Sequence, residues 1–383
     1  MTRREFAGLA AGAGLAAAQN PSQDTVTATA SQDKTPRVGI VLSDFKGSQD
    51  HDGTPLAGLA DPRPPQADLS AAQIDAMVRK AIELGNTRDG GLRKIVAADD
   101  WVVIKTDIAS FPGPDNARRW VPGMAADPRI VRSLVGWLAE NGCGGRFTIA
   151  EGSGEWQPAS RTKAPTDGWN TDWRGAFGGL SYRSLVADLA KRYSKVRFEI
   201  LDLNFADAIE APVPGKACAG RNPDGMYTIG KLIQQCDRLI SVAPLKTHPA
   251  AGVSLAMLNY LGIAPGSVYG FPKAGLLKLG TVDEVAVDLF SFHPADYALA
   301  GGCWGLEGDG VGVHHNLILA GANAVAVDAV GATVMGFAAA DLSFLKLAWR
   351  KGLGIADVDS IWTRGNEIEQ ARRVFLRARP VVP

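Results

Sequence analysis

The chain has 383 residues, of which 46% are hydrophobic and 21% are charged, a composition typical of globular proteins. Its 40 basic and 40 acidic side chains leave no net charge, so there is no electrostatic reason to expect nucleic acid or an anionic membrane as a partner. The four cysteines form no CxxC pair, which argues against an iron–sulfur cysteine motif and leaves both free thiols and disulfides open.

Residues 1–36 have the features of an export signal followed by a flexible linker. Arg3 and Arg4 precede Phe6 and a mildly apolar stretch of alanine, glycine and leucine that ends in small residues at 16–18. This order resembles a twin-arginine signal peptide, and the stretch is too short to span a bilayer. We therefore expect the twin-arginine export machinery as a partner, a periplasmic or extracellular location, and no transmembrane span.

Short apolar runs alternate with amphipathic segments along residues 37–383, which predicts βαβ units around a sheet. We expect strands at 38–42, 101–105, 147–150, 196–201, 238–243, 317–320 and 358–362, and helices at 69–84, 127–141, 181–193, 281–290, 324–335 and 341–350. Residues 43–65 are expected to form a long loop. The fold class is therefore α/β, a mostly parallel sheet with flanking helices in two lobes, with a sub-boundary near 205–230.

Two helix starts are marked by capping signals. Ser70 is followed three residues later by Gln73, the pattern of a capping box, and Asp127 precedes Pro128 as a cap precedes the first helical residue. Asp328 lies in an apolar helix start, where a carboxylate needs a partner.

We expect ligand-binding residues in the segments that directly follow strands, because ligands of such sheets bind outside the carboxyl ends of the strands. Lys246 and His248 follow the strand at 238–243 and are two residues apart. A lysine can hold a phosphate or carboxylate, and a histidine can transfer protons or ligate a metal. Asn259 could orient a ligand through its amide. The equally weighted alternative is that Lys246 is exposed to solvent and that His248 is a loop residue hydrogen-bonded to the backbone.

A second candidate lies near the C-terminus. Glu307 and Asp309 flank a glycine, so the backbone can bring both carboxylates close to one point, where they could share a proton or hold a hard cation. A plain turn with acidic residues in solvent is the alternative. His314 and His315 are adjacent, so on a strand they would face opposite ways.

Further polar residues follow two other strands. Lys105 is the last residue of the strand at 101–105, and Asp107 follows two residues later. Ser153 lies in a Glu-Gly-Ser-Gly segment whose backbone amides could bind an anion. A lysine at a strand end and a glycine-rich turn also have ordinary structural explanations. The chain has no Gly-x-Ser-x-Gly nucleophile elbow, no Walker loop and no His-Glu-x-x-His motif.

Taken together, these segments resemble the DUF362 family, a group of uncharacterised bacterial and archaeal proteins, over about residues 36–364. The segments that carry the resemblance are 105–107, 127–142, 243–248, 258–262, 307–311 and 321–328. This chain departs from the family pattern at Leu258, where a lysine is expected, at Asp107, where an asparagine is expected, and at Val311, where a proline is expected. Many members also carry a ferredoxin-like iron–sulfur segment, which this chain lacks.

The sequence thus predicts a DUF362-like α/β domain at 37–383 that binds a small-molecule ligand; its cofactor, including any metal, is unknown. One hypothesis is that the protein is an exported enzyme that acts on an anionic small molecule. Its catalytic residues would be Lys246, His248, Glu307 and Asp309, within ~10 Å of one another in a cleft. Lys105, Asp107, Ser153 and Asn259 would then bind the ligand. The alternatives are a non-catalytic periplasmic protein that binds a small ligand or metal, and a scaffold.

Overall fold

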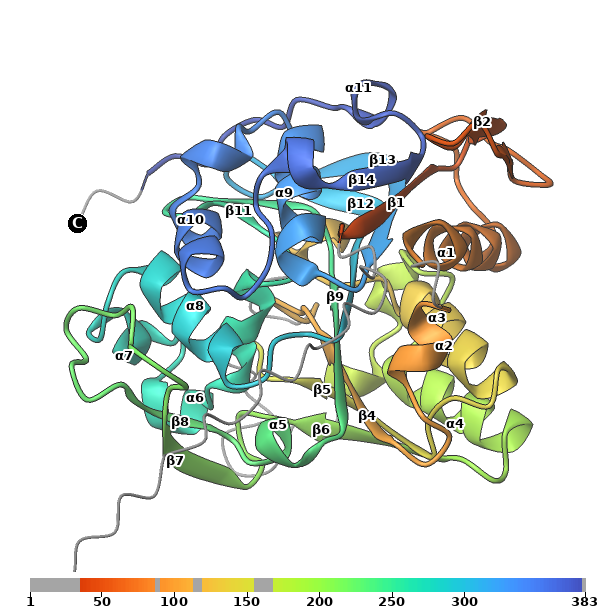
Figure 1. Cartoon of the computed structure of the whole chain (residues 1–383). Coiled ribbons are helices and arrows are strands. Elements are labelled where there is room, and N and C mark those ends of the chain that lie inside the picture. Colours follow the sequence, from red (N-terminus) through yellow and green to blue (C-terminus); the bar gives the residue numbers. More distant parts are fainter. Residues whose placement is uncertain (1–34, 87–89, 113–118, 155–167, 381–383) are drawn as a thin grey trace, which may run out of the picture. The chain divides into compact units, whose positions relative to one another are not determined.

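Within the residues that the computed structural model describes, 35–86, 90–112, 119–154 and 168–380, a ten-stranded sheet forms the centre of the fold (Figure 1). The expected export signal and most of the expected linker, residues 1–34, lie outside the described residues. The main strand order is β14-β1-β13-β12-β9-β4-β5-β6, and β10 and β11 join it beside β12. The strands are β1 (Arg37–Leu42), β4 (Trp101–Thr106), β5 (Arg146–Glu151), β6 (Arg197–Asp202), β9 (Arg238–Ala243), β10 (Lys246–His248), β11 (Gly252–Ser254), β12 (Tyr297–Glu307), β13 (Val311–Gly321) and β14 (Trp362–Gly365).

Most strand pairs of this sheet are parallel. Strands β12, β9, β4, β5 and β6 are parallel neighbours, and β14 is parallel to β1. The main exception is β13, which runs antiparallel to both β12 and β1. The expected mostly parallel α/β sheet is therefore confirmed. Residues 35–383 pack as one compact unit, in which β7 (Ala208–Pro212) and β8 (Met226–Gly230) form a separate hairpin. The two lobes with a sub-boundary near 205–230 stay a prediction.

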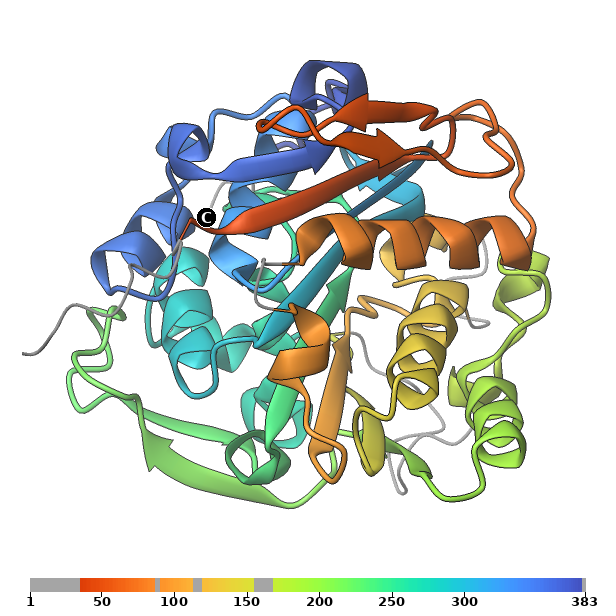
Figure 2. The same ribbon diagram turned by 45° about the vertical axis from the view of Figure 1, so that its right-hand side comes forward.

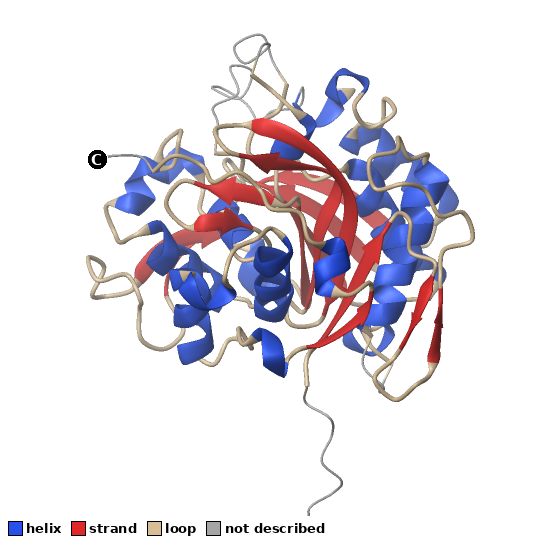
Figure 3. Cartoon of the chain, turned by 90° about the horizontal axis from the view of Figure 1, so that it is seen from above, coloured by secondary structure: helices blue, strands red, loops and turns tan. Residues whose placement is uncertain are grey.

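Helices cover both faces of the sheet, as the turned views show (Figures 2 and 3). The longer ones are α1 (Ala71–Gly85), α3 (Pro128–Glu140) and α4 (Tyr182–Arg192) on one face, and α8 (Val282–Ser291), α9 (Ala324–Val334) and α10 (Ser343–Arg350) on the other. Strand β4 shows why two layers form: Val102 and Ile104 are buried in the first layer and Val103 in the second, because successive side chains of a strand point to opposite faces. None of the helices in the described part of the chain is long and apolar enough to cross a membrane.

The short helices fill the connections between these layers. They are α2 (Leu92–Ile95), α5 (Leu232–Gln235), α6 (Gly266–Tyr269), α7 (Ala274–Leu277) and α11 (Ile368–Ala371). A 3-10 helix, η6 (Leu258–Ile263), follows β11 and is almost wholly buried.

The capping signals in the sequence act as expected. The Ser70 hydroxyl accepts a hydrogen bond from the Gln73 N–H, and the Gln73 side chain accepts one from the Ser70 N–H at 2.8 Å. Asp127 accepts the Arg129 N–H at 2.9 Å at the start of α3. Each pair satisfies amide groups that the helix itself leaves unpaired. The starts of α1 and α3 are therefore fixed by local sequence.

Two expectations were wrong in detail, and several strands were not expected. The expected strand at 358–362 is a 3-10 turn at Val358–Ser360, and β14 begins only at Trp362; Asp357 holds that turn by accepting the Ser360 hydroxyl at 2.6 Å. The expected loop at 43–65 contains a short hairpin of β2 (Gly47–Gln49) and β3 (Pro55–Ala57). The sequence predicted none of the strands β7, β8, β10, β11 and β12; in β12 two adjacent glycines interrupt the apolar run.

Candidate functional site

Three polar segments meet at the carboxyl edge of the sheet. Strands β5, β4 and β9 are adjacent and parallel, so their carboxyl ends lie at the same edge. Strand β10 begins three residues after β9 ends, and its Lys246 pairs with Leu306 of β12. This topology brings Lys105 of β4, Glu151 of β5 and Lys246 of β10 into one region.

Lys105 is the centre of a buried ionic cluster. Its side chain is 0% exposed, and its ammonium lies 2.7 Å from the Glu151 carboxylate, whose side chain is 4% exposed. The ammonium also donates to the Asn259 side-chain oxygen at 2.6 Å and to the Thr106 carbonyl at 2.8 Å. An ammonium has three N–H donors, and these three acceptors use all of them. Lys105 therefore organises the strand ends and has no donor left for a ligand.

Burial acts on both members of this pair in opposite senses. It lowers the pKa of Lys105 and raises the pKa of Glu151, because a charge is less stable away from water. The opposite charge of the partner counteracts each shift. Glu151 also accepts the Ile108 N–H at 3.0 Å, so the carboxylate is shared between two donors.

Asn259 is placed for this role by the turn before η6. Its amide nitrogen donates to the Lys105 carbonyl at 2.8 Å and to the Ser241 hydroxyl at 2.9 Å. Asp328 of α9 accepts the backbone N–H groups of Ala256 and Met257, each at 2.9 Å. The backbone N–H groups of the turn that positions Asn259 are thus the hydrogen-bond partners of the buried Asp328 carboxylate.

Glycine is required where η6 passes the cluster. A Cβ atom on Gly262 would lie 2.4 Å from Glu151 Oε1 and 2.5 Å from Lys105 Nζ. Both distances are shorter than any real carbon contact, so a larger residue here would push the ion pair apart.

Lys246 and His248 form the more open part of the site. The Lys246 ammonium lies 2.6 Å from the Asp107 carboxylate, its one hydrogen-bond partner among the described residues. Two of its three N–H donors therefore remain for another group. His248 is two residues further along β10, so both side chains leave the same face of the strand.

The protonation state of His248 follows from its hydrogen bonds. Its Nδ1 atom accepts the backbone N–H groups of Ala250 and Ala251 at 3.2 and 3.1 Å. Burial, with the charge of Lys246 beside it, lowers the pKa of His248 to about 4. The ring is therefore neutral at pH 7 and carries its proton on Nε2, which makes it a hydrogen-bond donor at that atom.

A third lysine, Lys273, completes the polar region. Its ammonium donates to the carbonyls of Gly152 at 2.7 Å and Leu261 at 3.2 Å. Burial lowers the pKa of Lys273 to about 7 and raises that of Asp202, at the end of β6, to about 6. Both groups are thus set to exchange protons near neutral pH.

The remaining predicted residues have other contacts. The Ser153 hydroxyl donates to the Ala109 carbonyl at 2.9 Å. Glu307 accepts the backbone N–H of Leu376 at 3.0 Å, and Asp309, exposed in the β12–β13 turn, pairs with the side chain and backbone N–H of Arg379. Both carboxylates therefore hold the C-terminal segment. A role for them in catalysis stays a prediction.

Sequence reasoning missed two members of the cluster, Glu151 and Lys273. Glu151 is the last residue of β5, directly before the Gly-Ser-Gly segment. Because Lys105 also lies at the end of its strand, this shared position could have predicted that the two are close. Lys273 follows a Gly-Phe-Pro segment away from any strand, and nothing in the local pattern distinguishes it.

The adjacent histidines behave as the strand geometry predicts. The His314 ring stacks on Trp304 with centroids 4.6 Å apart, whereas His315 is buried and lies 2.9 Å from the Ala371 carbonyl. They face opposite ways. No group of three or more His, Cys, Asp or Glu side chains within the described ranges could hold a metal ion.

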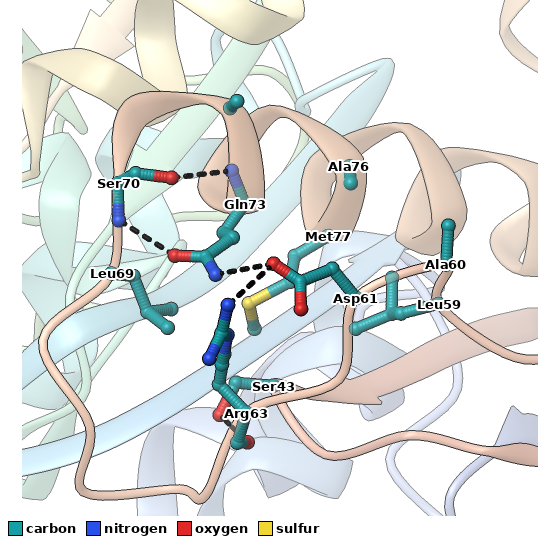
Figure 4. A pocket seen from close by; sticks show the side chains of 11 residues that line it. Ser43, Leu59, Ala60, Asp61, Arg63, Leu69, Ser70, Gln73, Ala76 and Met77 are labelled. Carbon is teal, nitrogen blue, oxygen red and sulfur yellow. Dashed lines mark hydrogen bonds and ion pairs between the residues drawn. The ribbon is translucent and has the colours of Figure 1, made fainter.

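A cavity separate from these residues lies beside the start of α1 (Figure 4). It has a volume of about 170 Å³. Its polar groups pair with one another: Asp61 accepts from Arg63 at 3.0 Å and from the Gln73 amide at 2.7 Å. The rest of the lining is largely apolar, from Leu59, Leu69 and Met77. This cavity offers less to a charged ligand than the lysine cluster, which comprises Lys105, Lys246 and Lys273 with their carboxylate partners.

The fold and the site define an α/β protein with a buried cluster of lysines and carboxylates at the carboxyl ends of its parallel strands. The chain belongs to the DUF362 family, whose model matches residues 102–333 and is described as a domain of unknown function. The matched range includes Lys105, Glu151, Lys246, Asn259 and Lys273. No curated protein matches the chain.

Among solved structures, the chain is similar to two distant proteins. The lactate racemase apoprotein from Thermoanaerobacterium thermosaccharolyticum is 16% identical, with a TM-score of 0.37, over 73% of this chain and 58% of that one. A protein from Thermotoga maritima is 14% identical, with a TM-score of 0.32, over 65% of this chain and 55% of that one. The chain thus spans less than two thirds of either protein.

Proposed function

We propose that this protein is an exported enzyme that binds an anionic small molecule at the carboxyl ends of β4, β5 and β10 and transfers protons to or from it. The observation that carries the proposal is the pair of donors on β10. Lys246 has two N–H groups without a partner among the described residues, and neutral His248 offers Nε2–H from the same face of the strand. Such donors suit a carboxylate or phosphate.

The charges around these donors support a role for Lys246 in binding. Asp107 compensates one lysine charge, so the site is not strongly positive when empty. An anion that replaces part of this contact would gain a charge-assisted hydrogen bond in a partly buried setting. Lys105 and Asn259 would act indirectly by fixing the ends of β4 and η6.

The acid–base part of the proposal rests on Lys273. A lysine with a pKa of about 7 is half neutral at neutral pH, so it can accept a proton as well as donate one. Its contacts with the carbonyls of Gly152 and Leu261 tie it to the loop after β5 and to η6, beside Glu151 and Lys105. His248, being neutral, would polarise a substrate oxygen and would not act as the base.

Binding and turnover can be tested separately. Thermal unfolding would be measured with inorganic phosphate and with small mono- and dicarboxylates, since a ligand that binds only the folded state raises the melting temperature. We expect stabilisation by at least one class and its loss in Lys246→Met. Lys278→Met removes a lysine from an exposed position and is the matched control. Stabilisation that is absent, or unchanged in Lys246→Met, would overturn the binding site.

Anions that bind would then be incubated with the protein and followed by NMR for new products. Turnover that Lys273→Met abolishes while binding persists supports the enzyme. Binding without any turnover would favour the non-catalytic binding protein instead.

The export part of the proposal rests on the sequence of residues 1–36 alone. A reporter protein fused behind these residues should reach the periplasm of a host with an intact twin-arginine pathway, and replacement of Arg3 and Arg4 by lysine should retain it in the cytoplasm. Export that does not depend on the arginine pair would contradict this part without affecting the site.

A further inference from the structure

A second group of reactive side chains lies at the opposite, amino edge of the sheet. Cys236 directly precedes Asp237 and β9, and Asp296 directly precedes β12, which is the parallel neighbour of β9. His293 lies between them. The Cys236 sulfur is 3.7 Å from His293 Nδ1, and His293 Nε2 is 3.2 Å from the Asp296 carboxylate. The three side chains thus form a line of thiol, imidazole and carboxylate.

The hydrogen bonds of His293 determine its charge. Nδ1 lies 2.8 Å from the Ile233 carbonyl, and Nε2 faces the Asp296 carboxylate. Both partners are acceptors, and a neutral imidazole has only one N–H to donate. Both contacts are satisfied only when the ring is protonated. In agreement, hydrogen bonds to Asp296 and Cys236 outweigh burial and raise the pKa of His293 to about 10.

We propose that Cys236, which lies beside the His293 imidazolium, is the cysteine that exchanges with small disulfides. An imidazolium next to a cysteine stabilises the thiolate, which is the nucleophilic form. In the exchange the Cys236 sulfur attacks one sulfur of the disulfide and forms a mixed disulfide. The old sulfur–sulfur bond breaks, and its electron pair leaves with the other sulfur as a thiolate. Cys236 is 7% exposed, which restricts the reaction to small reagents.

The other three cysteines provide an internal comparison. Burial raises the pKa of Cys143, raises that of Cys218 to about 11 and raises that of Cys303 to about 12. Cys218 is the most exposed of the four, but its neighbour Asp288 is an anion, which disfavours a thiolate. Exposure alone would therefore select Cys218, whereas the imidazolium selects Cys236.

Other charged groups face this pair from the elements around it. Arg238 of β9 bonds to Asp296 at 3.2 Å and to Asp100 at 3.1 Å, and the Tyr260 hydroxyl donates to the His293 carbonyl at 2.7 Å. Asp237, next in sequence, accepts the Trp101 N–H at 2.8 Å. Arg238 shares Asp296 with His293, so that carboxylate is held in place by two cations.

The test uses the folded, reduced full chain and bis(2-hydroxyethyl) disulfide at about pH 6.5, with peptide mass mapping over time. We expect Cys236 to form the mixed disulfide roughly 10-fold faster than Cys218. If Cys218 reacts first, or if Cys236 reacts only after denaturation, the proposal is overturned. This comparison needs no variant and so does not depend on the folding of one.

A variant then tests the cause. His293→Gln keeps a hydrogen-bonding side chain but removes the charge, and we expect the Cys236 rate at pH 6.5 to fall roughly 10-fold. Circular dichroism and the unchanged rate of Cys218 would verify that the variant is folded. An equal Cys236 rate in a folded His293→Gln protein would refute the role of the imidazolium.

Discussion

Replacement of Lys105 by methionine tests the central contact of the site. Methionine has nearly the same length, so the main effect is the loss of the ammonium. Three buried acceptors lose their donor: the Glu151 carboxylate, the Asn259 amide oxygen and the Thr106 carbonyl. Breaking a buried ion pair by removing one partner costs about 3–5 kcal/mol, because the other charge stays buried. We expect Lys105→Met to lower the free energy of unfolding by that amount at pH 7.

The cost should depend on pH. In the variant Glu151 has lost its cation, and burial holds its pKa above the usual value. A carboxyl group with a raised pKa in the folded state stabilises the protein below its unfolded pKa and loses that contribution as the pH rises. The deficit of Lys105→Met should therefore be smaller near pH 4 and grow toward pH 8. Adding Glu151→Leu removes the carboxylate that has lost its cation and should restore about 2–4 kcal/mol of the free energy of unfolding.

Urea unfolding followed by fluorescence would give these free energies. Lys195→Met, at an exposed position, is the matched control and should change stability by less than about 0.5 kcal/mol. A Lys105→Met protein within about 1 kcal/mol of wild type, or a double variant less stable than the single one, would refute the reasoning.

Three further outcomes follow from other contacts. Lys246→Met should abolish the stabilisation by an anionic ligand, seen as a lost thermal shift relative to the unliganded variant, and should itself lower stability, because it leaves the largely buried Asp107 carboxylate without its cation. Asp328→Ala leaves the N–H groups of Ala256 and Met257 without an acceptor and should cost about 2–5 kcal/mol in urea unfolding; a cost under 1 kcal/mol would contradict the role of that carboxylate. The raised pKa of His293 stabilises the fold fully below pH 6.5 and ceases to do so as the pH rises through about 10. The deficit of Asp296→Asn should therefore shrink across that interval, and a deficit independent of pH would exclude a charged His293.

Much of the architecture could be predicted from the sequence, because apolar runs mark several strands and capping residues mark several helix starts. The strand at 238–243 has the bounds that its apolar run indicates, and the helices after Ser70 and Asp127 begin where their caps indicate. The pattern fails where tertiary contacts override local preference. Strand β12 includes Gly301 and Gly302, whose positive φ angles accompany an irregularity in its pairing with β13, and no local rule reveals that.

The candidate site was predicted only in part, for a related reason. A parallel sheet gathers the residues that follow its strands, so Lys105 and Lys246 could be grouped from the expected topology alone. Glu307 could not be placed, because its partner is the backbone of Leu376 in a segment without regular structure. Lys273 joins the site through backbone carbonyls, and such contacts leave no pattern in the sequence.

The position of β1 affects how this chain can reach its fold. All six residues of β1 are buried, and its two neighbours in the sheet are β13 and β14, which are formed by residues near the other end of the chain. During synthesis, β1 must wait for almost the whole polypeptide to leave the ribosome before either of its edges can pair. Such long-range pairing slows folding and leaves an apolar strand exposed to other chains in the meantime. We therefore expect nascent or C-terminally truncated chains to be prone to aggregation and to depend on chaperones until β14 is complete.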